Sequence, residues 1–274
     1  MQGSQKADND FEINEEKFIA QLNSKKGDLN LEDNIECDIC NNKGYVYSLV
    51  DGNRVAKECK CMVARKTMRR LKNSNIPEEL LKKYTFKNFE AIEEWQTQLL
   101  NSCVNYAKEI INNDKKYWLC ISSITGSGKT HLATAIFQNI IKKKLIDGEY
   151  LLWNDFCSKI IPLSKSVIES QSLKYEQVMQ RLITVDLLYI DDMFKLTESK
   201  YSNDSIALLY KIINQRYINN KITIITTEYS QTEVNDIDSA ICGRISEKCD
   251  FGNWWFNLKK DPSRNYRLKR KNDF

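Results

Sequence analysis

The feature that most constrains the fold is a series of short apolar segments that alternate with longer amphipathic ones. The apolar segments are predicted strands at residues 117–122, 150–153, 187–190 and 222–226. Helical spacing of apolar residues is found between them, for example at 93–112 and 129–144. Strands that are apolar on both faces are typical of parallel sheets covered by helices on each side. The sequence therefore predicts an α/β fold built on a parallel sheet.

A glycine-containing loop joins the first predicted strand to the helix at 129–144. From Ser123 to Thr130 it matches the phosphate-binding pattern G-x-x-x-x-G-K-[ST], except that Ser123 replaces the first glycine. Gly126 and Gly128 let the backbone N–H groups turn inward around phosphates, and the helix dipole adds positive potential. We expect Ser123 to restrict the turn that opens the loop and to reduce affinity.

The side chains that follow the glycines suit a nucleotide with a metal ion. Lys129 would add a charge on the β and γ phosphates, and the Thr130 hydroxyl would ligate Mg²⁺. The predicted cofactor-binding residues of this loop are Gly126, Ser127, Gly128, Lys129 and Thr130.

Two adjacent aspartates follow the predicted strand at 187–190. A carboxylate pair at the carboxyl end of a central strand lies beside the phosphate loop in sheets of this kind. Asp191 would hold Mg²⁺ through water, and Asp192 would orient or deprotonate the attacking water. The alternative, a surface turn, is disfavoured by the upstream loop. The sequence predicts ATP and Mg²⁺ as cofactors.

The nine cysteines are of two kinds. Four form a C-x2-C pair and a C-x-C pair on either side of a predicted hairpin: Cys37, Cys40, Cys59 and Cys61. Two thiolate pairs so arranged can surround one tetrahedral Zn²⁺, which would supply much of the stability of a module with few apolar residues. Redox-active thiols are the alternative. The remaining five are expected to be small core residues: Cys103, Cys120, Cys157, Cys242 and Cys249.

Charge is distributed unevenly along the 274 residues, whose formal net charge is +4. Basic residues without acidic neighbours fill 60–72, and a second block fills the end of the chain. The second block consists of Lys259, Lys260, Arg264, Arg267, Lys269, Arg270 and Lys271, against Asp261 and Asp273. Such blocks suit a phosphate-rich polymer, and the alternative is a solvated helix face and a frayed tail. With no long uncharged stretch and no apolar leader, we expect a cytoplasmic protein without membrane association.

Composition and motifs together predict four segments. They are a flexible acidic arm at 1–36 with a helix near 15–22, a zinc module with a basic linker helix at 37–75, an ATPase domain at 76–258 and a basic tail at 259–274.

With these residues in view, the chain resembles the DnaC/DnaI-type AAA+ ATPases that load the replicative helicase. The resemblance covers roughly residues 37–267, and the Asp-Asp pair and the cysteine module ahead of a basic helix are both similar to loaders of this kind. It rests on the segments 126–133, 190–192, 212–217, 243–245 and 76–89.

The resemblance implies further site residues. Arg244 resembles the arginine finger, which reaches the ATP of a neighbouring subunit; a surface arginine near a helix end is the alternative. Arg216 would serve the same interface or brace its own helix. The family usually has an asparagine after the fourth strand to sense the γ-phosphate, where this chain has Thr226, Thr227 and Glu228. A carboxylate there would repel the γ-phosphate, so either Thr227 senses it or sensing is weak. No helical lid is expected, so oligomer contacts would close the nucleotide site.

The function implied by the resemblance is an ATPase, slow and stimulated by its partners, that loads a hexameric DnaB-type helicase onto single-stranded DNA during replication initiation. It would self-associate in the ATP state, with the zinc module as docking platform. Two other functions stay open: an IstB-like ATPase helper of a transposase, and a nucleotide-gated adaptor with little hydrolysis. Ser123 and Glu228 are the residues that favour the adaptor.

Overall fold

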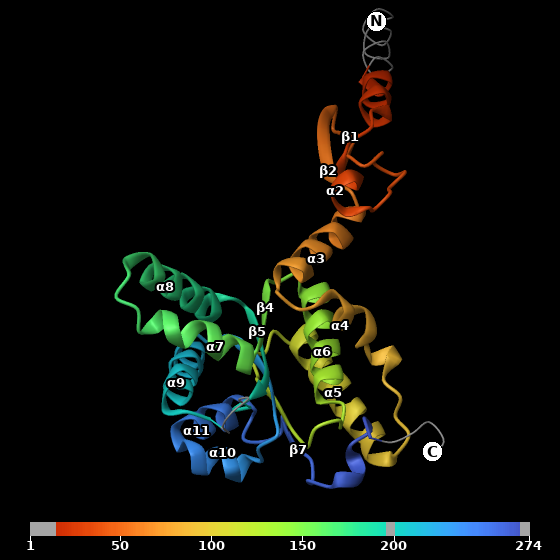
Figure 1. Ribbon diagram of the computed structural model, residues 1–274. Helices are drawn as coiled ribbons and strands as arrows, with labels where there is room; N and C mark the ends of the chain where they lie inside the picture. Colours follow the sequence, from red (N-terminus) through yellow and green to blue (C-terminus); the bar gives the residue numbers. More distant parts are fainter. Residues whose placement is uncertain (1–14, 196–200, 269–274) are drawn as a thin grey trace, which may run out of the picture. The chain divides into compact units, whose positions relative to one another are not determined.

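The computed structural model describes residues 15–195 and 201–268 (Figure 1). The chain divides into two compact units, one that ends at Arg69 and one that begins at Arg70. The four-part division expected from the sequence stays a prediction. Residues 1–14 of the acidic arm lie outside the described residues, as do Lys269, Arg270, Lys271 and Asp273 of the basic tail.

The first unit is organised around a hairpin of β1 (Tyr45–Val50) and β2 (Asn53–Glu58). The predicted hairpin is confirmed, and Asp51 and Gly52 at its turn both have the positive φ that a tight hairpin needs. The unit also contains a helix over 15–24, α2 (Leu29–Asp33) and the first part of α3 (Cys61–Asn73).

The described part of the predicted arm is attached to this hairpin. The Asn23 side chain exchanges two hydrogen bonds of 2.9 Å with the backbone of Tyr47, and Glu15 forms an ion pair with Arg54. Residues 15–24 are therefore part of the first unit's structure and not a free arm.

The second unit contains a five-stranded sheet in the order β4-β5-β6-β3-β7, with every neighbouring pair parallel. The strands are β3 (Leu119–Ser122), β4 (Gly148–Leu152), β5 (Leu187–Met193), β6 (Ile222–Thr227) and β7 (Trp255–Asn257). The predicted α/β class with a parallel sheet is confirmed. Because all strands point the same way, their carboxyl ends share one edge, where the loop after β3 meets the ends of β5 and β6.

Helices cover both faces of this sheet, α5 and α6 on one and α7 to α11 on the other (Figure 1). The helical elements are α4 (Glu78–Lys83), η1 (Phe86–Asn88), α5 (Glu94–Asn112), α6 (Lys129–Lys144), α7 (Trp153–Ser164), α8 (Glu169–Thr184), α9 (Asn203–Ile218), α10 (Gln231–Ile237), α11 (Ser239–Lys248) and η2 (Pro262–Arg264). Within 15–195 and 201–268, none of the helices is long and apolar enough to cross a membrane.

Alternate residues of the strands pack into two separate hydrophobic cores, one on each face of the sheet. Leu119 and Ile121 of β3 pack with α5 and α6, whereas Cys120 between them packs with the helices of the opposite face. This period of two is the expected consequence of the pleat in a sheet that is covered on both sides. The five cysteines predicted to be core residues are all buried.

Arg216 is in the interior of the second unit and not on its surface. Its side chain, 0% exposed, donates to the carbonyls of Leu182, Val185 and Ile222 and to the Thr223 hydroxyl, over 2.5–3.0 Å. These acceptors belong to the end of α8 and the start of β6. The bracing interpretation of this arginine is therefore the one that agrees with its position.

Replacing Arg216 by methionine should destabilise the protein strongly. The variant removes the donors of four hydrogen bonds in the interior, and unsatisfied buried polar groups cost about 1–3 kcal/mol each. We expect the free energy of unfolding to fall by about 3 kcal/mol or more in a denaturant titration. Lys211→Met on the exposed side of the same helix is the control and should change it little. Equal stability of the two variants would contradict the bracing role.

Candidate nucleotide site and metal centre

The loop between β3 and α6 has the backbone geometry of a phosphate-binding loop. Gly126 and Gly128 lie at φ +80° and +91°, a left-handed region that side chains with a Cβ rarely adopt. Gly128 is the residue before the first turn of α6, so the amino end of that helix faces the loop. The Ser127 hydroxyl donates to the Ile124 carbonyl at 2.9 Å and fixes the turn.

Lys129 closes this loop on itself. Its Nζ donates to the carbonyl oxygens of Ser123 and Ile124, both at 2.8 Å. Burial lowers the pKa of Lys129, while the carboxylates of Asp192 and Glu228 act in the opposite direction. The ammonium is therefore held at the centre of the loop by contacts that phosphate oxygens can replace.

Ser123 fits the first position of the loop without strain. Its φ is not in the left-handed region, and its N–H donates to the Thr227 carbonyl of β6 at 3.1 Å. The expectation that serine would restrict this turn has no support in the backbone, because the position does not need the freedom of glycine. The Ser123 hydroxyl is buried and makes no hydrogen bond to any described residue.

Asp191 is the most heavily hydrogen-bonded carboxylate of the site. Oδ1 accepts from the hydroxyls of Thr226 at 2.6 Å, Tyr189 at 2.8 Å and Thr130 at 3.2 Å, and Oδ2 accepts from Tyr150 at 3.2 Å. Burial raises the pKa of Asp191, and the bonds from Thr226, Tyr189 and Thr130 oppose that rise. The structure thus brings together the predicted metal-binding residues, Thr130 and Asp191.

The two tyrosines on Asp191 were not among the predicted site residues. Tyr189 precedes Asp191 by two residues on β5, so the period of a strand places both on one face and gives a signal that sequence analysis can use. Tyr150 is on β4, and its contact with Asp191 depends on the register that pairs Leu152 with Asp191. No local pattern reveals that register.

Asp192 turns out of the strand at the point where the β5–β6 pairing becomes irregular. It has a φ of +54°, its N–H donates to the Thr226 hydroxyl at 2.9 Å, and its carboxylate lies 3.5 Å from Lys195 Nζ. The side chain is about one-quarter exposed, at 25%. Adjacent aspartates therefore occupy different environments, one buried among hydroxyls and one accessible to water.

Thr227 and Glu228 have different surroundings from those expected. The Thr227 hydroxyl is fully buried, donates to the Met193 carbonyl at 3.0 Å and accepts from the Tyr229 N–H. The Glu228 carboxylate accepts from the hydroxyl of Thr125 in the phosphate loop and from Lys195 at 2.8 Å. Phosphate sensing by Thr227 stays a prediction, and it is Glu228 that contacts the loop.

The C-terminal part of the second unit crosses the phosphate loop. The Leu258 N–H donates to the Ser122 carbonyl at 2.9 Å, and the Tyr266 N–H donates to the Gly126 carbonyl at 3.2 Å. The Asn265 side chain lies so close to Gly126 that a Cβ there would overlap it. We call residues 258–268 the strap.

The strap is also anchored outside the phosphate loop. The Tyr266 hydroxyl bonds Glu93, and the Arg264 guanidinium lies 4.7 Å from the centre of the Trp95 ring. Both contacts tie the strap to the segment that leads into α5. The absence of a helical lid and the closure of the site by oligomer contacts both stay predictions.

His131, the only histidine of the sequence, is a packing residue. Its Nε2 lies 2.8 Å from the Thr85 carbonyl, and its ring stacks on Tyr84 with the ring centres 4.8 Å apart. Burial lowers its pKa. These contacts join the segment before α5 to the first turn of α6.

Arg244, the predicted arginine finger, lies half-buried on α11 against α9. Its Nε donates to Asn214 at 2.9 Å, and its guanidinium lies over the rings of Tyr210 and Tyr217 at 5.2 and 5.8 Å. Within the described part of the chain it makes no recorded contact with the loop at 123–130. Its position agrees with a residue that acts on another subunit, although its role stays a prediction.

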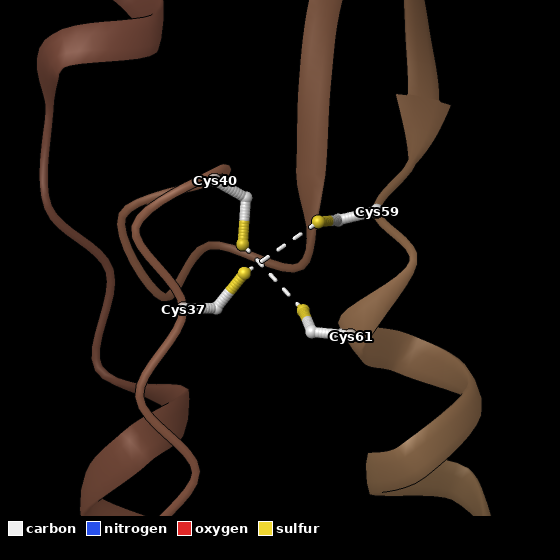
Figure 2. A group of neighbouring side chains, drawn as sticks. All are labelled: Cys37, Cys40, Cys59 and Cys61. Atoms are coloured by element: carbon white, nitrogen blue, oxygen red, sulfur yellow. Dashed lines mark hydrogen bonds between the residues drawn. The ribbon is translucent and has the colours of Figure 1, made fainter.

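The four predicted zinc ligands lie together in the first unit, where their sulfur atoms point toward one another (Figure 2). All four Sγ atoms are within 4.8 Å of one another, with Cys37 and Cys59 at 3.7 Å and Cys40 and Cys61 at 3.6 Å. Zn–S bonds of about 2.3 Å in a tetrahedron require sulfur atoms about 3.8 Å apart. The donor set and spacing therefore fit a structural zinc site.

The surroundings of this cluster also suit a metal bound by thiolates. The Gly44 N–H donates to Cys40 Sγ at 3.3 Å, a contact that favours a thiolate. The Arg65 guanidinium is buried nearby, bonded to Asp33 and to the Ile35 carbonyl. Arg65 is thus a structural residue of the first unit and is not free to bind a polymer, unlike the exposed Lys60 and Arg69 of the same basic block.

Comparison with known families identifies the family of the second unit. The family model of the bacterial DnaA ATPase domain matches residues 80–249, which is more than half of the chain. The match includes the phosphate loop, the aspartate pair and Arg244. The chain belongs to that family. The predicted AAA+ class and the resemblance to the DnaC/DnaI-type proteins are confirmed, and an ATPase domain of this kind implies that the site takes ATP.

Two curated proteins illustrate the relationship. YqaM of Bacillus subtilis is 29% identical over 202 residues, which are 71% of this chain and 61% of YqaM. The match therefore leaves more than a third of YqaM's length uncovered. The replicative helicase loader DnaC of Buchnera aphidicola subsp. Acyrthosiphon pisum is 26% identical over 204 residues, 74% of this chain and 78% of that protein.

A solved structure confirms the fold. The crystal structure of DnaI is 17% identical, covers 69% of this chain and 94% of that one, and has a TM-score of 0.50.

Zinc content and stability should both depend on the cysteine cluster. Cys59→Ser removes one of four thiolates, so we expect purified protein with less than one zinc per chain and a first unit that unfolds at lower temperature. Metal analysis and a thermal scan measure the two effects. Cys157→Ser, a buried cysteine of the second unit, is the control and should keep the metal. Equal zinc content in the two variants would contradict the assignment.

Tyr150 should affect magnesium binding rather than nucleotide binding itself. Tyr150→Phe removes one hydroxyl from Asp191, and a hydrogen bond to a charged group is worth about 1.5 kcal/mol or more. We therefore expect about a tenfold rise in the Mg²⁺ concentration needed for half-maximal binding of a fluorescent ATP analogue. Tyr106→Phe is the matched control, since its buried hydroxyl bonds the Tyr117 carbonyl away from the site. The same shift in both variants would show that Tyr150 acts only through stability.

Proposed function

We propose that this chain is an ATP-dependent loader of a hexameric DnaB-type replicative helicase, which it places on single-stranded DNA during replication initiation. The observation that carries the proposal is the similarity to a replicative helicase loader over about three-quarters of both chains. The nucleotide site supports it, because the phosphate loop, Thr130 and Asp191 are assembled at one edge of the sheet.

ATP would bind with its phosphates in the loop at 123–130. Lys129 leaves the carbonyls of Ser123 and Ile124 and pairs with the β and γ phosphates. Thr130 and Asp191 hold Mg²⁺, which when bound neutralises charge on the phosphates. Asp192, accessible to water beside the buried Asp191, orients or deprotonates the attacking water.

Arg244 would act in a neighbouring copy of the chain. Asn214 and the two tyrosine rings hold its guanidinium in one place on α11, which reduces the entropy lost when it reaches a phosphate. An arginine in this role is worth about 10³-fold or more in hydrolysis rate. Hydrolysis would accordingly be slow in the isolated chain, and self-association in the ATP state would increase it.

The first unit would dock on the helicase through the zinc module. The exposed basic residues Lys60 and Arg69, and Lys259 of the strap, would follow the backbone of single-stranded DNA. The cytoplasm is where such a complex works.

One observation favours a second candidate, the nucleotide-gated adaptor. Glu228 is a carboxylate on the phosphate loop, where the family usually has an asparagine. If it slows hydrolysis, the chain would bind ATP and partner but turn over little.

Native mass spectrometry of the full chain with the cognate replicative helicase tests the proposal. We expect a defined multimer on the helicase hexamer with ATP and Mg²⁺ present, and loss of complex and of loading with Lys129→Ala. Lys142→Ala is the control on the same helix, since its ammonium bonds Gln138 at the far end of α6. No complex in any nucleotide state would contradict the loader and favour the transposase helper. A complex with full loading by Lys129→Ala would exclude the role of ATP.

A further inference from the structure

Lys195 contacts two acidic side chains at the edge of the sheet where the phosphate loop lies. Its Nζ lies 2.8 Å from Glu228 after β6 and 3.5 Å from Asp192 at the end of β5. The same Glu228 oxygen accepts from the hydroxyl of Thr125 in the loop. Lys195 therefore sits in a chain of polar contacts that begins at the loop itself.

Glu228 needs a cation at this position. Burial alone would raise the pKa of Glu228, but the hydrogen bonds from Lys195 and Thr125 outweigh it and hold the pKa below its usual value. The carboxylate is therefore ionised, beside a loop built to bind anions. Without Lys195 its charge would repel a γ-phosphate.

The backbone of Lys195 is fixed, while its ammonium can turn. The Lys195 N–H donates to the Asp192 carbonyl at 3.0 Å, and the preceding Phe194 is fully buried. The Lys195 side chain, by contrast, is 46% exposed. A long flexible stem on a rigid anchor lets the ammonium exchange one acidic partner for another with little change elsewhere.

Lys195 is also within electrostatic reach of the phosphate loop. The Glu228 oxygen that accepts from its ammonium at 2.8 Å also accepts from the Thr125 hydroxyl of the loop. Two ammonium groups thus act on the same small region, Lys129 inside the loop and Lys195 beside it. Lys129 pairs with both the β and the γ phosphates, of which ADP keeps only the β-phosphate. A second ammonium beside the loop can therefore add a contact to the γ-phosphate that ADP lacks.

We infer that Lys195 distinguishes ATP from ADP in this chain, and that Glu228 holds its ammonium beside the loop until a γ-phosphate replaces it as partner. The inference rests on the proposed ATP site. The Lys195–Glu228 pair would then sense the γ-phosphate, as an asparagine does in the family. Glu228 would bind the lysine ammonium when no γ-phosphate is present. Lys195 then contributes to the affinity for ATP and not to that for ADP.

Equilibrium binding of two nucleotides to the full chain tests this directly. The probes are ADP and the non-hydrolysable β,γ-imido analogue of ATP, each with Mg²⁺, measured by calorimetry. We expect Lys195→Met to lower the affinity for the analogue about tenfold and to keep the affinity for ADP within about twofold of the wild-type value. The reason is that only the analogue loses a charge-assisted contact. Lys221→Met is the matched control, since Lys221 makes an ion pair of the same 2.8 Å length with Asp186 at the opposite edge of the sheet.

Neutralising the acidic partner provides an independent check. Glu228→Gln should raise the affinity for the analogue and leave the affinity for ADP unchanged, because the repulsion from the carboxylate disappears while Lys195 remains. The double variant should bind the analogue more tightly than Lys195→Met alone, because the unpaired carboxylate is gone. A variant that has merely unfolded cannot give this result.

The outcomes separate this inference from the proposed function. If the wild-type chain binds neither nucleotide, both are overturned. If it prefers the analogue and Lys195→Met keeps that preference, or weakens both nucleotides equally, only the role of Lys195 is overturned.

Discussion

The buried carboxylate of Asp191 is the group on which the nucleotide site depends. Four hydroxyls from β4, β5, β6 and the first turn of α6 converge on it, so it links the strands that form the edge of the sheet to the helix that follows the phosphate loop. A carboxyl group at this depth is tolerated only with such hydrogen-bond partners. The same bonds fix its orientation relative to Thr130, as a metal ligand requires.

The other charged groups of the site lie near the ends of β5 and β6. Asp192 leaves the strand at an irregularity in the pairing, and Lys195 and Glu228 follow the ends of β5 and β6. Their side chains are partly exposed, whereas Asp191 is not. The site thus combines a buried carboxylate with a partly exposed ion pair.

Local sequence signals predicted the parts of the site that are local in the chain. The phosphate loop was predicted from Gly126 and Gly128, whose positive φ is readily adopted by glycine. The helix at 129–144 was predicted with both ends correct. The cysteine pairs were predicted because ligand spacing is a local property. Tyr150, Lys195 and the strap were not, since each reaches the site through strand order, register or a late crossing of the chain. Arg216 shows the same limit, because helical spacing alone did not distinguish a buried brace from an interface residue.

The most direct measurement is a crystal structure of the full chain with a non-hydrolysable ATP analogue and Mg²⁺. The account predicts phosphates within the loop at 123–130, a metal ion between Thr130 and Asp191, and the Lys129 ammonium on phosphate oxygens instead of the Ser123 and Ile124 carbonyls. It would be contradicted by a nucleotide bound elsewhere with the loop still closed on Lys129, or by a metal ion with no ligand or water linking it to Asp191.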